Sequence, residues 1–150
     1  VKENFKKLIE EGVLKAESKQ LDIYTFALYH DHESRFARVC IDTLESSKEA
    51  VLSSNSFSNE EFLRSIEAGD LDSAALWNAT IGRSLMLGDF SLVNASEMSV
   101  PSKVDSSSFY LAMVRAIQEK REAIERQSGH GQDLLFCCST HSSEVGLIWS

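Results

Sequence analysis

The segment Leu21–His30 places apolar side chains on both faces of an extended chain. In a strand, successive residues point to opposite faces, so two sets of side chains can be separated. One set is Leu21, Ile23, Ala27 and Tyr29, and the other is Tyr24, Phe26 and Leu28. A strand with two apolar faces must be covered on both sides. This segment therefore predicts a strand in the interior of a sheet, and it constrains the fold more than any other feature.

The residues after this strand predict an antiparallel partner. Residues 31–34 are polar and read as a turn, and Arg35–Thr43 then alternates apolar and polar side chains. Alternation of this kind is typical of a half-buried strand, so residues 21–43 predict a β-hairpin. Residues 133–139 and 145–149 are two further apolar runs joined by a polar turn, and they predict a second hairpin.

Helices are predicted in several places by apolar residues at helical spacing. Ser58 and Glu61 have the spacing of a capping box, with Phe57 as a staple, and Gly69 stands where a helix would end. The residues after Ser58 that would form a buried face are Phe62, Leu63 and Ile66. The predicted helices span residues 3–19, 44–52, 58–69, part of 73–88, and 105–128.

The order of these elements predicts one α+β domain over residues 1–150, an antiparallel sheet built from two β-hairpins and covered by amphipathic helices. We expect the 105–128 helix on one face of the sheet and residues 3–19 on the other face or at its margin. Residues 90–94 predict a short strand or an extended segment, and Val100-Pro101 ends whatever precedes it.

Negative charge is concentrated in one stretch of the chain. Residues 42–72 contain eight acidic and two basic residues, which is −6 of the net charge of −8. A field concentrated in this way attracts a cationic partner and repels nucleic acid and anionic membranes. The basic residues are scattered, so nucleic-acid binding is disfavoured.

Several observations predict a cytoplasmic protein. No apolar run approaches the roughly 20 residues that span a bilayer, and the first residues lack the apolar core of a signal peptide. Three cysteines cannot all form pairs, and reduced thiols are the simpler interpretation. We predict no cofactor, no metal and no catalytic residue.

One alternative is a small metal- or cysteine-dependent enzyme. His30 and His32 would point to the same side at the end of a strand, and Cys137, Cys138 and His141 could join them if the two hairpins met. No Cys-x-x-Cys or His-Glu-x-x-His spacing supports this site. Cysteines packed as small apolar residues are therefore favoured.

Two segments resemble a group of bacterial proteins. Leu21–Asp31, with its strand, Phe-Ala-Leu-Tyr run and acidic turn, resembles the opening of an uncharacterised bacterial α+β domain family. Asp133–His141 resembles the closing strand and polar turn of that family. The family is similar to the immunity proteins of polymorphic and contact-dependent toxin systems. The resemblance implies a cytoplasmic binding protein.

Charge and resemblance together predict a non-catalytic, immunity-like protein that neutralises a cationic toxin or effector domain through an acidic face. The predicted partner-binding residues are, first, Glu60, Glu61, Glu67, Asp70 and Asp72 and, next, Asp31, His32 and Glu33. A third hypothesis is self-association through an apolar cluster that the sequence pattern does not place in one regular element. That cluster comprises Trp77, Leu85, Met86, Leu87 and Phe90.

Overall fold

The structure is a computed structural model that describes residues 1–104 and 106–150, with Ser106 described as backbone alone. Its elements confirm the α+β class. They are α1 (Lys2–Ser18), β1 (Thr25–Asp31), β2 (Phe36–Asp42), α2 (Leu44–Glu67), α3 (Leu71–Ala74), the 3₁₀ turn η1 (Leu87–Asp89), β3 (Leu92–Ser99), α4 (Ser106–Arg126), the 3₁₀ turn η2 (Gly131–Asp133), β4 (Leu135–Cys138) and β5 (Leu147–Trp149).

The described residues form a five-stranded sheet in the order β3-β2-β1-β4-β5. The prediction that Leu21–His30 contains an interior strand is confirmed, because β1 lies in the middle. β1 pairs antiparallel with β2, from Thr25 opposite Asp42 to Asp31 opposite Phe36. β2 also pairs antiparallel with β3, and β4 with β5.

The prediction of a purely antiparallel sheet is wrong, because β4 runs parallel to β1. The physical reason is the path of α4. The chain leaves the 3₁₀ turn η2 beside the start of β1, where the Leu135 N–H donates to the Tyr24 carbonyl at 3.2 Å. β4 therefore begins at the same end of the sheet as β1, with Leu135 opposite Thr25. A helix that carries the chain back along the sheet is the usual connection between parallel strands.

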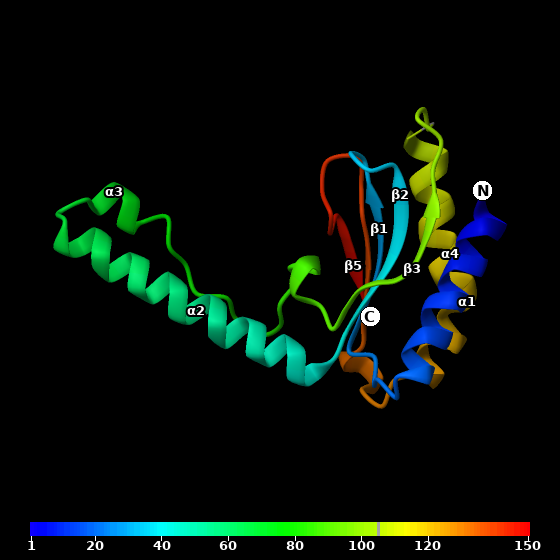
Figure 1. Ribbon diagram of the computed structural model, residues 1–150, viewed down its shortest axis with the longest axis horizontal. Coiled ribbons are helices and arrows are strands. Elements are labelled where there is room, and N and C mark those ends of the chain that lie inside the picture. The colour runs from blue at the N-terminus through cyan, green and yellow to red at the C-terminus, as the bar shows by residue number, and fades with distance from the viewer. Residues whose placement is uncertain (105) are drawn as a thin grey trace.

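Helices α1 and α4 lie side by side on one face of the sheet (Figure 1). The rings of Phe5 and Phe109 meet edge to face, with their centroids 5.2 Å apart. Of the two positions predicted for residues 3–19, the opposite face is therefore wrong. Helix α1 lies on the same face as α4, where it contacts the edge strand β3. Each helix has one apolar stripe, and the two stripes together complete a single core. Fully buried side chains of this core include Phe5, Leu8, Ile9, Phe26, Leu28, Val39, Ile41, Met113, Ile117, Ile124 and Phe136.

Gly12 explains how closely α1 approaches the sheet. A Cβ at this position would lie 2.6 Å from Val39 Cγ1, closer than real Cβ atoms approach another carbon. The Ser96 hydroxyl on β3 donates to the Leu8 carbonyl at 2.6 Å in the same region. Glycine lowers the helix propensity of α1, and here it makes room for β2.

The second face of the sheet is covered by irregular chain. Leu87 and Phe90, in and after η1, are buried against Ala27, Cys40 and Cys137. These two residues belong to the apolar cluster that the sequence pattern did not place in one regular element. The cluster as a whole does not form one exposed patch, because only its member Met86 is largely exposed, at 68%.

Residues 44–82 form an arm that leaves the sheet at the end of β2 and extends away from it (Figure 1). The prediction of two helices, over 44–52 and 58–69, is wrong because α2 is continuous. The Thr43 side chain caps the start of α2 by accepting from the Ser46 N–H at 3.2 Å. Ser58, the predicted N-cap of the second helix, is therefore an interior residue of α2. No glycine or proline interrupts residues 44–67.

The predicted end of this helix at Gly69 is confirmed. Gly69 has a φ of +72°, its N–H donates to the Ile66 carbonyl, and the Asp70 N–H donates to the Ser65 carbonyl. This pattern of bonds is a Schellman motif. Asp105, the predicted first residue of the 105–128 helix, lies outside the described residues, and the rest of that prediction agrees with α4.

Candidate interaction surface

The arm carries most of the net negative charge of the chain. Residues 44–82 hold seven acidic and two basic residues, which is −5 of the net charge of −8. Asp42, the eighth acidic residue of the 42–72 stretch, does not contribute to this surface. It is fully buried at the root of the arm and accepts from the Ser91 N–H at 3.1 Å. Burial raises the pKa of the Asp42 carboxyl.

Four carboxylates follow one line along α2, and we name Glu45, Glu49, Glu60 and Glu67 the acidic stripe. Their separations of 4, 11 and 7 residues are close to one, three and two turns of an α-helix. All four side chains are exposed, and none forms an ion pair with a described residue. The stripe therefore presents negative charge that no ion pair with a described residue offsets.

The predicted residues Glu60, Glu61, Glu67, Asp70 and Asp72 all lie on the distal half of the arm. Two of them have local structural contacts. Glu61 accepts from the Arg64 guanidinium at 2.6 Å. Asp70 caps α3 by accepting from the Ser73 N–H at 3.0 Å, and hydrogen bonds from Ser73 lower the pKa of the Asp70 carboxyl.

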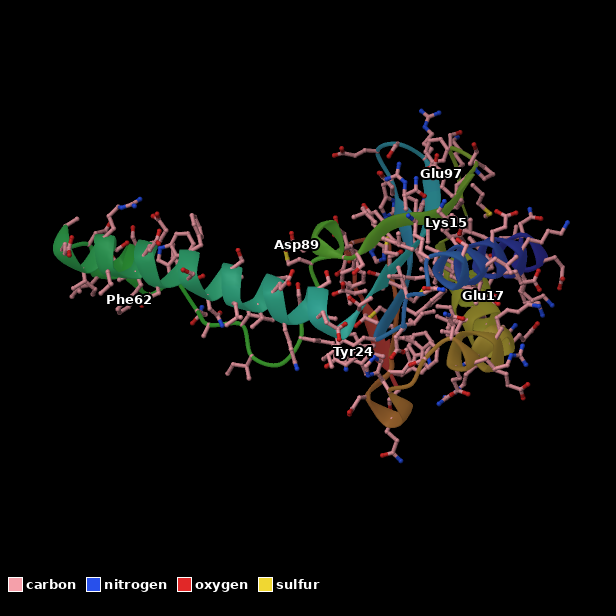
Figure 2. All side chains as sticks on the ribbon, turned by 60° about the horizontal axis from the view of Figure 1, so that its bottom comes forward. Lys15, Glu17, Tyr24, Phe62, Asp89 and Glu97 are labelled. Atoms are coloured by element: carbon pink, nitrogen blue, oxygen red, sulfur yellow. The ribbon has the colours of Figure 1, made fainter. Side chains whose placement is uncertain are left out.

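The arm also exposes apolar side chains. We name Leu52, Phe62, Leu63 and Ile66 the apolar patch; their exposed fractions are 71%, 40%, 49% and 42%. Figure 2 shows Phe62 on the distal half of α2, far from labelled Tyr24 and Glu97. The prediction that Phe57, Phe62, Leu63 and Ile66 form a staple and a buried face is wrong, because Phe57 is also 56% exposed. The Phe57 ring instead meets Trp77 edge to face.

Sequence reasoning missed this patch because it treated apolar spacing as a sign of burial. A signal was available: the apolar residues of α2 do not form one stripe, since Phe57 lies on the far side of the helix from Phe62 and Ile66. The only buried residue of α2 is Ser47. The return segment is held instead by Asn55, whose side-chain amide bonds both backbone groups of Thr80, at 3.0 and 2.7 Å.

A depression of about 530 Å³ lies at the root of the arm, between α2 and η1. Its lining includes the carboxylates of Glu49 and Asp89, the hydroxyls of Ser46 and Ser53, and the Phe57 ring. Carboxylates beside an aromatic ring can accept an ammonium or guanidinium group.

Asp31, His32 and Glu33 do not join the arm. Asp31 ends β1, and His32 and Glu33 lie in the turn that leads to β2. Helix α2 begins only after β2, whose seven residues span about 20 Å. The Asp31 carboxylate accepts from the Ser34 N–H at 3.0 Å and from Arg38 at 2.9 Å. Hydrogen bonds from Ser34 are the main cause of the lowered pKa of Asp31. This carboxylate stabilises the turn.

The histidines form a small cluster with Tyr110. The Tyr110 hydroxyl lies 2.8 Å from His30 Nδ1 and 3.2 Å from His32 Nε2. His30 is only 4% exposed, and burial lowers its pKa. Among the described residues, no group of three or more His, Cys, Asp or Glu side chains is placed to hold a metal ion.

The two cysteines that the enzyme alternative would bring to the histidines are separated by the sheet. Cys138 packs in the core beneath α1 and α4, while Cys137 packs on the other face with Leu87 and Phe90. Burial raises the pKa of each thiol to about 12. Both thiols are therefore protonated at neutral pH, a form in which cysteine is a poor nucleophile and metal ligand.

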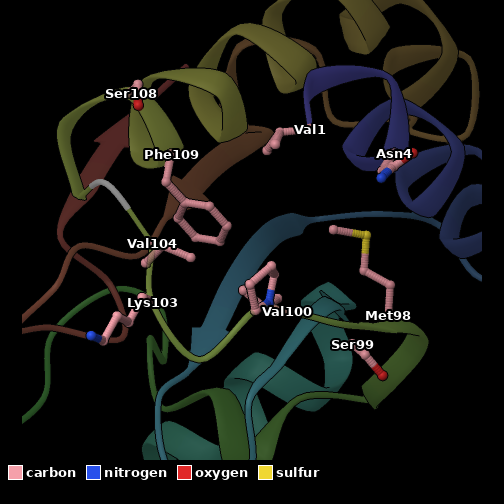
Figure 3. A pocket seen from close by; sticks show the side chains of 10 residues that line it. Val1, Asn4, Met98, Ser99, Val100, Lys103, Val104, Ser108 and Phe109 are labelled. Atoms are coloured by element: carbon pink, nitrogen blue, oxygen red, sulfur yellow. The ribbon is translucent and has the colours of Figure 1, made fainter.

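A largely apolar pocket of about 420 Å³ lies at the opposite side of the molecule from the arm. It opens between the first residues of α1, the end of β3 and the start of α4, and Met98, Val100 and Phe109 line it (Figure 3).

Of the described helices, none has both the length and the apolarity to cross a membrane. Comparison of the chain with protein-family models, with curated proteins and with solved structures found no match. The acidic stripe and the apolar patch on the arm are therefore the features on which a functional proposal is based.

Proposed function

We propose that this chain is a non-catalytic binding protein that neutralises a cationic protein, in the manner of an immunity protein, and that the arm is the contact region. The observation that carries the proposal is the acidic stripe. Its four carboxylates are exposed on an element that stands away from the sheet, and no described basic side chain pairs with them.

The charge distribution favours fast association with a basic partner. Charge concentrated on one projecting element gives a directional field that steers an oppositely charged protein toward it. Steering of this kind weakens as salt is added, because the Debye length is about 8 Å at physiological ionic strength.

Two features of the body support a binding role over catalysis. The buried thiols are protonated at neutral pH, and Cys137 and Cys138 pack on opposite faces of the sheet. The resemblance to immunity-type domains rests on Leu21–Asp31 and Asp133–His141, which contain β1 and β4, the paired parallel strands.

The partner can be identified by photo-crosslinking in the cells from which the gene comes. A photoreactive residue at position 63 on the arm should capture a basic protein, and the same residue at position 14 on α1 should not. Both native leucines are exposed, at 49% and 62%, so neither replacement disturbs the core. Capture of the same proteins from both positions, or of none from position 63, would contradict the proposal.

The captured protein then allows a rate measurement. Reversal of three stripe residues, Glu49→Lys/Glu60→Lys/Glu67→Lys, should slow association by about tenfold or more and flatten its salt dependence. The matched control is Glu11→Lys/Glu17→Lys/Glu122→Lys, which changes the net charge equally. These exposed residues of α1 and α4 form no ion pair with a described residue. Equal slowing by both variants would refute the arm as the contact region.

Neutralisation has its own test. Expression of the captured protein should arrest growth, and co-expression of this chain should restore it. The stripe variant should restore growth less well than the matched control. A captured protein that leaves growth unaffected would refute the immunity-like role.

A further inference from the structure

We infer that the arm binds a basic amphipathic helix, which lies lengthwise on α2 over the acidic stripe and the apolar patch. This inference rests on the proposed function, since it names the class of segment through which the cationic partner would bind. It adds a requirement that charge alone does not impose, namely a row of apolar side chains on the partner.

The stripe and the patch share one side of α2. Leu52 follows Glu49 by three residues, and Leu63 follows Glu60 by three and precedes Glu67 by four. Residues at these spacings are neighbours on the surface of a helix. Acidic and apolar side chains therefore share one exposed face of α2. Phe62 and Ile66 lie at its apolar edge, where Phe62 borders residues 77–79 of the return segment.

The length of this face matches a helical segment. Leu52 and Ile66 are 14 residues apart, which corresponds to about 21 Å along α2, or about four turns. A partner helix whose leucine-like residues recur at spacings of three and four residues over about 14 residues would extend along the whole patch. Lysine or arginine beside those residues would then lie within reach of the stripe.

Two other occupants fit the face less well. A partner strand binds by pairing with an exposed sheet edge, whereas the backbone groups inside α2 are bonded within the helix. A second copy of this chain would bring the same unpaired carboxylates against the stripe, and like charges at close range disfavour such pairing. A basic amphipathic helix would bury the exposed apolar side chains and pair its cations with the carboxylates of the stripe.

The test uses three synthetic peptides and the fluorescence of Trp77. The chain has two tryptophans, so Trp149→Phe leaves Trp77, on the arm, as the single reporter. The first peptide is a 14-residue leucine–lysine sequence with helical apolar spacing. The second has the same composition in scrambled order, and the third is oligolysine of equal charge.

We expect the amphipathic peptide to bind at least about tenfold more tightly than the other two. Leu52→Ser/Leu63→Ser should remove this preference and leave oligolysine binding unchanged, because both leucines are exposed and the stripe is intact. Leu14→Ser, on an exposed site of α1, is the matched control and should preserve the preference.

The outcomes separate this inference from the proposed function. Equal binding of the three peptides, or no binding of any, would overturn the amphipathic-helix inference, and equal binding would leave a charge-driven function standing. Sedimentation could instead show a dimer that the Leu52→Ser/Leu63→Ser variant no longer forms. That result would overturn the amphipathic-helix inference and identify a second copy of the chain as the occupant. A clear preference for the amphipathic peptide, together with failure of the growth test, would refute the immunity-like role alone.

Discussion

The body and the arm of this molecule are stabilised in different ways. The body, residues 1–43 and 91–150, buries side chains on both faces of a sheet, and many of its core residues are completely inaccessible. The arm, residues 44–82, buries Ser47 in α2 and Ala74 in α3, and it exposes Leu52, Phe57 and other large apolar side chains. A helix that is held mainly by its own hydrogen bonds remains free to bind another molecule.

The arm is stabilised locally at each of its turning points. Thr43 caps the start of α2, the Schellman motif at Gly69 ends it, and Asp70 caps α3. Asn55 then bonds the returning chain at Thr80. Local bonds of this kind resist fraying but bury little apolar surface. The arm should therefore open at lower free energy than the body.

Phe26→Ala should have the largest effect on stability. Phe26 lies on the central strand β1 and is completely buried, so its removal leaves a cavity in the core. We expect a loss of about 3–5 kcal/mol in the free energy of unfolding, measured by chemical denaturation. Phe62→Ala on the arm is the matched control and should cost much less. Equal losses would show that arm and body form one cooperative core.

Arg83→Met should come next, because Arg83 joins the arm to the body. Its guanidinium donates to the Tyr24 carbonyl at 2.8 Å, to Thr25 Oγ1 at 3.0 Å and to the Asp133 carbonyl, and it lies 3.7 Å from the Tyr24 ring centroid. We expect a loss of about 2–3 kcal/mol in the same denaturation experiment. Arg83→Lys should recover little of this loss, because an ammonium group lacks the planar fork. Full recovery by lysine would show that charge alone matters.

Asn55→Ala should loosen the arm and leave the body unchanged. The variant loses both hydrogen bonds to Thr80, each with a contribution of about 1 kcal/mol. Hydrogen exchange should become faster in residues 78–82, while the denaturation midpoint of the body stays constant. Asn59→Ala, an exposed site on the same helix, is the control. A shift in the midpoint of the body would contradict the separation of the two regions.

The contribution of Asp42, at the junction between arm and body, to the free energy of unfolding should depend on pH. Burial raises the pKa of this carboxyl above its ordinary value of 3.8, so the native state retains the proton to a higher pH than the unfolded chain does. The contribution of Asp42 to stability should therefore fall as the pH rises from 3.8 through the raised native pKa.

The comparison of the native protein with Asp42→Asn isolates this effect, because the other carboxyls cancel. The free energy of unfolding of the native protein, minus that of the variant, should decrease across this pH range. A difference that is independent of pH would show that Asp42 titrates equally in both states.

His32→Ala should have the smallest effect. His32 is exposed in the turn after β1, and its contact with the Tyr110 hydroxyl, at 3.2 Å, is at the surface. We expect a change within about 0.5 kcal/mol in the free energy of unfolding. A large loss would show that the cluster of His30, His32 and Tyr110 is a structural part of the body.

Several features could be predicted from short stretches of sequence. The two-sided apolarity of Leu21–His30 correctly placed β1 inside the sheet, and Gly69 marked the end of a helix. The regular apolar stripe after Ser106 agreed with α4. Each of these signals depends on neighbouring residues alone, so the local structure that it predicts does not depend on how the rest of the chain packs.

The candidate site was predicted in part. The acidic stretch was visible in the sequence, and most of its residues lie together on the arm. Asp42 was misread as a surface charge, and the apolar patch was misread as a buried face. Both errors arise because exposure depends on what packs against a residue, and the residue types alone do not show it.

By itself, the sequence determined the α+β class, the interior position of β1 and the concentration of negative charge in one segment. These follow from side-chain periodicity and composition, which act over a few residues. Tertiary structure decided that β4 runs parallel to β1, that α1 and α4 share one face, and that α2 is continuous and stands away from the sheet. The physical reason is that an apolar side chain can be buried by many partners, and only the complete packing of the chain decides which partner it meets or whether it meets none.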